Sequence, residues 1–251
     1  MGRETFLAKV TWENDWPVVN PGVGILTETV EIDLPEWKPE KDPTSYTCRT
    51  GHKTCVPGSN RTYDFTNMKV LGDEFLMLRN PKDDMYALVE GEGLRLKFDT
   101  VTLKEKASPS FVAIRQQHHQ FEVAAELSTK EVTAGKTAGL ALVQSNEYHL
   151  KAEVANGKAQ VILCENSEDT CLGSVDVTAD MVTLKLKIDL LKASVILAEG
   201  DKETVLADNI DVRKLSTEVA GGFVGCCVGV YAVADTEDGT SACFTKLSYE
   251  A

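Results

Sequence analysis

Four segments between Phe75 and Leu150 decide the fold, and they read FLMLRNPKDDMYAL (75–88), GLRLKF (93–98), SPSFVAIRQQHHQFEVAAEL (108–127) and AGLALVQSNEYHL (138–150). Each segment contains a short run in which apolar and polar residues alternate. Asn-Pro, Lys-Asp-Asp and Ala-Gly-Lys separate the runs, and such residues are typical of turns. Alternation with a period of two predicts β-strands that bury one face.

The same pattern continues to the end of the chain. In FEVAAEL (121–127), one face carries Phe121, Val123, Ala125 and Leu127, and the other carries Glu122 and Glu126. Asn156-Gly157 lies between two alternating runs and predicts a hairpin, and residues 183–200 predict two further strands. No segment predicts a helix longer than a turn or two. About ten or more short strands predict an all-β, two-sheet sandwich.

The order of motifs along this stretch resembles the C-terminal β-sandwich of family 43 glycoside hydrolases. The motifs are Leu-Arg-Asn-Pro (78–81), Gly-Leu-Arg-Leu (93–96), Phe-Val-x-x-Arg-Gln-Gln-His (111–118) and Ala-Gly-Leu (138–140). In that family the sandwich follows a five-bladed propeller that carries the catalysis. The resemblance implies a concanavalin-like jelly roll.

Residues 1–34 resemble the closing segment of the family's propeller, through Gly-Arg-Glu-Thr-Phe-Leu (2–7), Val-Thr-Trp (10–12) and Trp-Pro-Val (16–18). The usual glycine before Trp-Pro is Asp15 here. The arginine of the first motif lies by the sugar site in the family, and it corresponds to Arg3. The family's three catalytic carboxylates come from earlier propeller blades, which this sequence does not contain. We therefore expect no glycoside hydrolase activity from it.

Three parts are predicted: a propeller-derived segment (1–34), a linker rich in proline and cysteine (35–66), and the β-sandwich (67–251). All three tryptophans lie within the first 37 residues, at Trp12, Trp16 and Trp37. They would pack back on the sandwich, contact another subunit in a homo-oligomer, or line a pocket. We expect an N-terminal extension packed on the sandwich, because large aromatic side chains usually belong to a core.

Charge and hydropathy exclude several classes of partner. The net charge of the chain is −13 and its pI is about 4.8, which is the wrong sign for nucleic acid or an anionic membrane. No apolar run reaches the roughly 18 residues of a membrane helix. The first residues do not have the pattern of a signal peptide.

Two features nevertheless favour the secretory pathway or an extracellular location. Asn60-Arg61-Thr62 is a glycosylation sequon in a polar loop. Four of the seven cysteines have matched spacings that predict two hairpin disulfides, Cys48–Cys55 and Cys164–Cys171. Of Cys226, Cys227 and Cys243, two would pair and one would stay free.

The candidate ligand site centres on Arg115, Gln117 and His119. These residues share the parity of the apolar face of the run that follows, so an unbroken strand would bury them. Either they are structural polar residues at the end of a sheet or they line a ligand cleft. Tyr148 and His149 could reach the same place. We expect Arg3 and Trp16 to complete the site, with an arginine donor and an apolar cover.

No metal or cofactor is predicted. The family's usual Phe-Asp in the last strand is Phe244-Thr245 here, which removes an oxygen ligand for a structural Ca²⁺. No clustered histidines or Cys-x-x-Cys motif indicates zinc. No nucleotide-binding or hydrolase fingerprint is present.

Two functions remain open. The resemblance implies a stand-alone sandwich without hydrolase activity that binds carbohydrate or acts as an accessory module. Alternatively, the sandwich serves as a cofactor-independent biosynthetic enzyme, a cyclase or Diels–Alderase-like catalyst of a secondary metabolite, since one fold hosts many functions. In either case the ligand is a glycan or another small molecule.

The N-terminal segment is expected to be integral to the fold. A chain that begins near Tyr63 should be insoluble or much less stable, because apolar surface costs about 25 cal/mol per Å² in water. The apolar residues at stake are Phe6, Leu7, Val10, Trp12 and Trp16. Thermal melting checks this: a shortened chain that unfolds cooperatively at the temperature of the full chain contradicts it.

Overall fold

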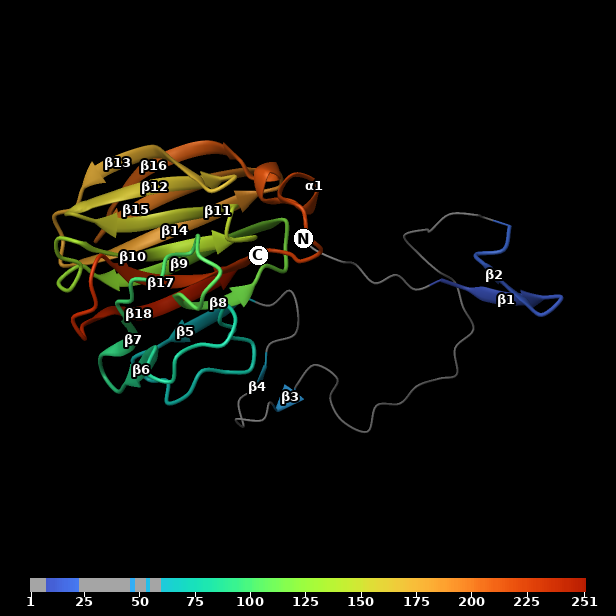
Figure 1. Cartoon of the computed structure of the whole chain (residues 1–251), viewed down its shortest axis with the longest axis horizontal. Coiled ribbons are helices and arrows are strands. Elements are labelled where there is room, and N and C mark those ends of the chain that lie inside the picture. Colours follow the sequence, from blue (N-terminus) through green and yellow to red (C-terminus); the bar gives the residue numbers. More distant parts are fainter. Residues whose placement is uncertain (1–7, 23–45, 48–52, 55–59) are drawn as a thin grey trace. The chain divides into compact units, whose positions relative to one another are not determined.

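The computed structural model describes residues 8–22, 46–47, 53–54 and 60–251. The chain divides into two compact units (Figure 1). One comprises Arg3–Pro43, and the other comprises Met1–Gly2 with Thr44–Ala251.

The described part of the smaller unit is a β-hairpin of β1 (Val10–Glu13) and β2 (Trp16–Val19). Its two-residue turn holds Asn14 and Asp15 at φ values of 52° and 62°. Such turns need positive φ at both positions, and asparagine and aspartate tolerate it better than most residues. This explains how Asp15 can stand where the family usually has glycine. Whether the segment packs on the sandwich stays a prediction.

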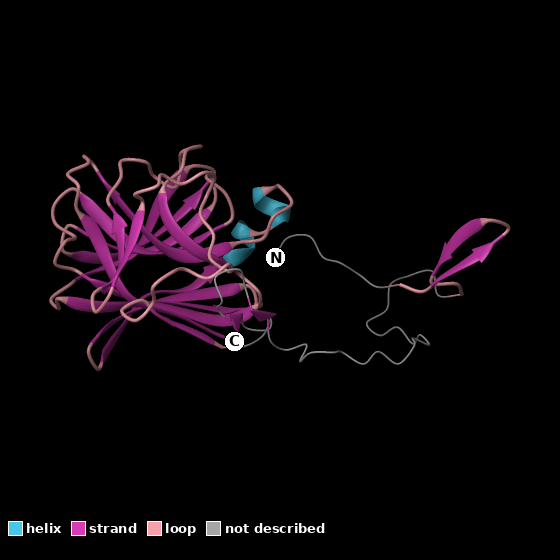
Figure 2. Cartoon of the chain, turned by 90° about the horizontal axis from the view of Figure 1, so that it is seen from below, coloured by secondary structure: helices cyan, strands magenta, loops and turns pink. Residues whose placement is uncertain are grey.

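The larger unit is a sandwich of two antiparallel sheets, seen as two layers in Figure 2. The six-stranded sheet has the order β13-β12-β11-β10-β17-β8. Its strands are β8 (Ser110–Arg115), β10 (Lys136–Val143), β11 (His149–Ala155), β12 (Lys158–Glu165), β13 (Glu168–Asp176) and β17 (Cys227–Ala234).

The second sheet has the order β16-β15-β14-β9-β18-β7-β6, with β5 also paired to β18. Its strands are β5 (Arg61–Asp64), β6 (Tyr86–Val89), β7 (Gly93–Lys97), β9 (Gln120–Ser128), β14 (Met181–Asp189), β15 (Lys192–Glu199), β16 (Lys202–Asp211) and β18 (Ser241–Glu250). A separate short pair joins β3 (Tyr46–Thr47) to β4 (Lys53–Thr54). The helices of the described residues are a 3₁₀ helix at Val212–Leu215 and α1 at Thr217–Ala220.

The predicted all-β sandwich is confirmed, and the core lies between the two sheets. Phe121, Val123, Ala125 and Leu127 are buried there, beside the apolar residues of the neighbouring strand β14 and facing the opposite sheet. Each such side chain contributes roughly 1.5–3 kcal/mol on burial. The predicted hairpin joins β11 to β12, with Asn156 and Gly157 at φ values of 50° and 73°.

The six-stranded sheet is also covered on its outer face. A second apolar cluster there contains Leu103, Phe111, Ala113, Ala141, Val143 and Tyr231. Leu76 and Leu78, from the segment before β6, pack against it. β8 and β10 are therefore buried on both faces over most of their length. Within the described residues, Leu76, Leu78 and Leu103, which cover this face, come from segments outside the strands of the two sheets.

The sandwich begins earlier than the predicted residue 67. Arg61–Asp64 forms β5, whose Arg61 is opposite Tyr249 and whose Asp64 is opposite Lys246 of β18. Residues 35–66 are rich in proline and polar residues, and this composition predicts a linker. Backbone pairing with the last strand, distant in sequence, makes Arg61–Asp64 part of the sheet.

The predicted Cys164–Cys171 disulfide is wrong, since both cysteines are free thiols. The strands continue to Glu165 and Glu168, so the turn is only Asn166-Ser167. Cys164 is opposite Asp169, whereas Cys171 is opposite Ile162, which places the two cysteines diagonally. Cys164 is buried and Cys171 is exposed.

The other cysteine predictions have mixed outcomes. Cys226, Cys227 and Cys243 are also free, so the predicted pair among them is absent. Cys48 and Cys55 lie outside the described residues, and their disulfide stays a prediction.

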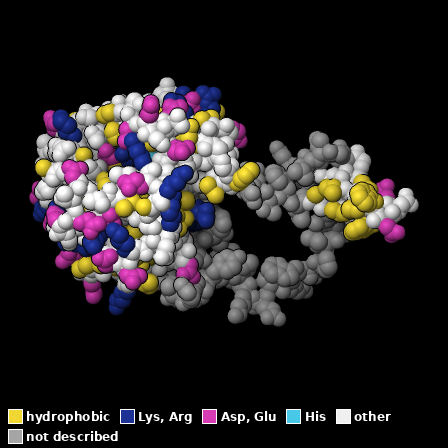
Figure 3. Space-filling model, in the orientation of Figure 1, with side chains coloured by type: hydrophobic (Ala, Val, Ile, Leu, Met, Phe, Trp, Pro, Cys, Tyr) yellow, Lys and Arg dark blue, Asp and Glu magenta, His cyan; other side chains and the backbone are white. Residues whose placement is uncertain are grey.

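Charge is spread evenly over the face of the sandwich shown in Figure 3, where acidic and basic side chains alternate without a large patch of one sign. No helix in the described ranges has both the length and the apolar character that crossing a bilayer requires.

At Gly139 of β10, the backbone of the neighbouring strand β11 approaches closely. A Cβ at Gly139 would lie 2.2 Å from the Ala152 carbonyl oxygen and 2.6 Å from the Glu153 Cα, and backbone cannot move aside. We expect Gly139→Ala to lower the free energy of unfolding by about 3 kcal/mol. Gly157→Ala is the control: a Cβ there meets nothing within 4 Å, and only its φ of 73° opposes alanine.

The control variant, Gly157→Ala, should lower the free energy of unfolding by only about 1 kcal/mol. Urea unfolding of both variants measures the difference. Equal losses at the two glycines would contradict the close approach of β10 and β11.

Candidate functional site

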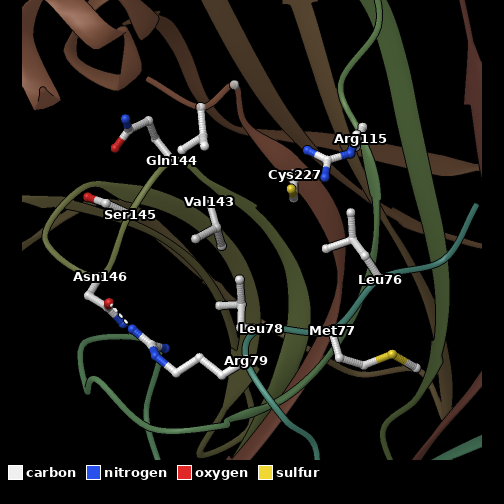
Figure 4. Close-up of a pocket in the computed structure, with 12 residues that line it drawn as sticks. Leu76, Met77, Leu78, Arg79, Arg115, Val143, Gln144, Ser145, Asn146 and Cys227 are labelled. Carbon is white, nitrogen blue, oxygen red and sulfur yellow. Dashed lines mark hydrogen bonds between the residues drawn. The ribbon is translucent and has the colours of Figure 1, made fainter. Parts of the chain in front are cut away.

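A cleft of about 390 Å³ opens at one end of the six-stranded sheet (Figure 4). It lies where β8 ends, β10 ends and β17 begins. Four chain segments form its walls, and the lining residues are Leu76, Met77, Leu78, Arg79, Arg115, Val143, Gln144, Ser145, Asn146, Val224, Gly225 and Cys227.

The apolar part of the cleft continues the outer apolar cluster. Leu76, Leu78 and Val143 all belong to or pack against that cluster. The backbone of Leu76 exchanges two hydrogen bonds with Ala113 of β8, at 2.8 and 3.0 Å. This pairing holds segment 76–79 against the sheet, so the leucines form a fixed wall.

Arg79 and Asn146 make a rigid polar corner, and their hydrogen bond is drawn in Figure 4. Arg79 donates to the Asn146 side-chain oxygen and to the Ala107 carbonyl, each at 2.6 Å. The Asn146 amide donates to the carbonyls of Leu103 and Glu105, at 2.8 and 2.6 Å. Arg79 has a φ of 61°, a strained value for arginine that these bonds help to hold.

Arg115 is the last residue of β8, and its exposed guanidinium faces the cleft opposite Cys227. Burial raises the pKa of the Cys227 thiol, and the charge of Arg115 lowers it by less. The thiol therefore stays protonated near neutral pH and is not an activated nucleophile. Arg115 instead offers up to five donors to a ligand in the cleft.

The far wall combines an unpaired acceptor with exposed apolar surface. Gln144 is buried and donates to the Gly221 carbonyl at 2.8 Å, while its oxygen has no partner among the described residues. Phe223 and Val224 are 71% and 56% exposed on the segment that leads into β17, and Val224 lines the cleft. Exposed aromatic and aliphatic side chains beside donors and acceptors are typical of ligand sites.

Only Arg115 of the predicted row reaches this cleft. β8 ends at Arg115, and β9 begins at Gln120 in the other sheet, so residues 116–119 connect the sheets and the parity argument is wrong. Gln117 accepts a hydrogen bond from Arg61. The exposed His119 does not line the cleft, and its carbonyl accepts from Leu190.

The remaining predicted residues lie elsewhere. Tyr148 packs partly against the main core, and His149 is fully buried in β11, outside the cleft. Burial lowers the pKa of His149 to about 4, so its ring is neutral. Arg3 lies outside the described residues, and Trp16 is on the β1–β2 hairpin. Their part in the site stays a prediction.

Asn60 of the sequon is exposed, and its side-chain oxygen accepts a hydrogen bond from the Ala251 backbone nitrogen at 3.1 Å. Its glycosylation also stays a prediction.

Sequence reasoning missed Arg79, Gln144 and Asn146, which line the cleft, and Phe223, which is next to the lining residue Val224 in the sequence. Arg79 is part of the Leu-Arg-Asn-Pro motif (78–81), which in the sequence indicates a turn and not a ligand contact. The signal that could have drawn attention to Phe223 is a bulky apolar residue between glycines, Gly222 and Gly225, in a turn-rich segment.

Residues 62–250 match the family described as β-xylosidase C-terminal concanavalin A-like domain. A xylosidase/arabinosidase of Butyrivibrio fibrisolvens is 33% identical over an alignment of 248 residues that covers 97% of this chain and 45% of the relative. A non-reducing end α-L-arabinofuranosidase of Bacteroides ovatus is 28% identical over 96% of this chain and 43% of its own length. The chain thus spans less than half of these relatives.

Solved structures agree with the fold. A xylan β-1,4-xylosidase from Bacillus halodurans has a TM-score of 0.81 at 25% identity, over all of this chain and 47% of that structure. A Bacteroides ovatus protein titled as a xyloglucan-locus family 43 enzyme also has a TM-score of 0.81, at 23% identity and the same coverage.

The cleft yields a matched pair of variants. Asn146→Ala removes two donors and one acceptor from the polar corner, so we expect a loss of about 2 kcal/mol in the free energy of unfolding. Arg115→Ala should change it by no more than about 0.5 kcal/mol, because the side chain is exposed. Thermal and urea unfolding compare the two. If Arg115→Ala destabilises as much as Asn146→Ala, Arg115 is structural and not a ligand contact.

Proposed function

This chain belongs to the family of β-xylosidase C-terminal concanavalin A-like domains, and from this premise we propose that it is an accessory sandwich that binds pentose-containing glycans and does not hydrolyse them itself. The observation that carries the proposal is the cleft at the ends of β8, β10 and β17. It joins a leucine wall to a cluster of side chains that can hydrogen-bond an uncharged sugar.

The chemistry of the cleft fits recognition better than hydrolysis. Its lining in the described chain contains no aspartate or glutamate. Glycoside hydrolysis of the usual kind needs two carboxyl groups on either side of the bond. Arg79, Arg115 and Asn146 instead supply donors and acceptors, which suit hydroxyl groups.

Apolar contact would come from the same site. The faces of a pentose are largely apolar, and sugar sites commonly place an aromatic ring against them. The sandwich contains no tryptophan after residue 37, so Phe223, which is exposed and precedes the lining residue Val224 in the sequence, is the aromatic side chain to which we assign this contact. The printed names of the relatives, xylosidases and arabinosidases, favour xylose and arabinose units as the ligand class.

Calorimetric titration of the full chain with xylotriose and arabinotriose tests the proposal. We expect binding that Arg115→Ala and Phe223→Ala each weaken about tenfold, equivalent to about 1.4 kcal/mol. Arg213→Ala is the matched control, since it removes an exposed arginine that does not line the cleft. Cellotriose, a hexose trimer, tests the preference for pentoses.

Three outcomes would overturn the proposal. The first is an absence of pentose binding at millimolar concentration. The second is equal weakening by Arg213→Ala. The third is thermal stabilisation by apolar polycyclic compounds and not by pentoses, which would favour the recruited biosynthetic enzyme. Release of xylose from an aryl xyloside by the purified chain, abolished in Arg115→Ala, would contradict the non-hydrolytic part.

A further inference from the structure

Three potential metal ligands meet on the outer face of the six-stranded sheet, outside the cleft. His149 of β11 is directly opposite Cys164 of β12, and Cys164 is directly opposite Asp169 of β13. Residues opposite one another on neighbouring antiparallel strands share a face of the sheet. One nitrogen, one sulfur and one carboxylate oxygen from these residues lie within 4.8 Å of one another.

His149 presents an unused lone pair to this cluster. Its ring is completely buried, and its Nδ1 lies 3.4 Å from the Ser145 carbonyl oxygen. A carbonyl only accepts, so Nδ1 carries the proton and Nε2 does not. Nε2 is buried and has no hydrogen-bond partner in the described part of the chain. Histidines that bind metal commonly have this arrangement, with the second nitrogen donating to a carbonyl.

Cys164 and Asp169 complete the cluster from the two strands beyond. The Cys164 thiol is completely buried, 3.5 Å from the Glu147 carbonyl oxygen. Asp169 is partly exposed, and its Oδ2 lies 3.0 Å from Lys104 Nζ and 3.8 Å from Lys151 Nζ. The cluster is therefore closed on the histidine side and open to solvent on the aspartate side.

We propose that His149, Cys164 and Asp169 bind a divalent transition-metal ion, for which Zn²⁺ is the best match. Imidazole, thiolate and carboxylate are all zinc ligands, and a buried thiolate disfavours Mg²⁺ and Ca²⁺. Binding replaces the thiol proton, which leaves to solvent, by the metal–sulfur bond. The thiolate and carboxylate then balance the charge of the ion. Three protein ligands leave a fourth position for water on the exposed side.

The two lysines limit the affinity of the site. Both contact Asp169, and a dication placed beside its carboxylate would be repelled by their charges. We therefore expect weaker binding than at structural zinc sites, whose ligands are commonly four cysteines or histidines. Lys104→Met removes one of these two positive charges and leaves all three proposed ligand residues unchanged. It should tighten metal binding about tenfold.

Titration of the untagged full chain with Co²⁺, followed by displacement with Zn²⁺, tests the site. A cobalt–thiolate charge-transfer absorption band reports the metal–sulfur bond directly. We expect one ion per chain, loss of the band in Cys164→Ser, and about tenfold weaker binding in Asp169→Asn. Cys171→Ser is the matched control, because Cys171 is an exposed cysteine of β13 that is outside the cluster.

The result is decisive in either direction. A band that survives in Cys164→Ser, or that is lost in Cys171→Ser, overturns the proposal, as does an absence of any band at millimolar Co²⁺. Asp169→Asn lies at the exposed edge and should leave the fold intact. It therefore tests the site even if Cys164→Ser, at a buried position, lowers the melting temperature.

Discussion

The sandwich depends on burial of β8 and β10, in the six-stranded sheet, on both of their faces. The inner face packs against the second sheet, and loops that contribute Leu76, Leu78 and Leu103 cover part of the outer face. A sheet covered on both faces buries more apolar surface than one that faces water. The loops that provide this cover also form one wall of the cleft. The candidate site is therefore a consequence of how the outer face is closed.

One turn connects the two sites of the outer face. Residues 144–148 join β10 to β11, with Gln144 and Ser145 nitrogens bonded to the Tyr148 carbonyl at 3.2 and 3.1 Å. Gln144, Ser145 and Asn146 of this turn line the cleft, whereas the Ser145 and Glu147 carbonyls contact His149 and Cys164. A metal ion at the cluster would hold the same turn that positions Asn146. Ligand binding and metal binding would then be coupled through a short segment of backbone.

The cleft differs from a catalytic centre in its chemistry. The Cys227 thiol is protonated near neutral pH. The described lining places no carboxylate across the cleft from Arg79 or Arg115. The Asn146 side chain donates to a backbone carbonyl. Such groups orient a ligand and do not transfer protons near neutral pH.

The sequence by itself determined the all-β class, the strands and the hairpin at Asn156-Gly157, because alternation and turn residues act over a few neighbours. The order of motifs along the sequence was sufficient to identify the family. Local spacing was misleading where the result depends on strand register, as for Cys164 and Cys171, or on a change of sheet, as between Arg115 and Gln120.

Only the tertiary structure decided which side chains meet. Arg79 and Asn146 are 67 residues apart in the chain, and they are joined because two loops cover the same end of the sheet. His149, Cys164 and Asp169 meet because three strands pair in a particular register. Neither arrangement leaves a periodic signal, since contacts between distant segments depend on the packing of the whole sheet.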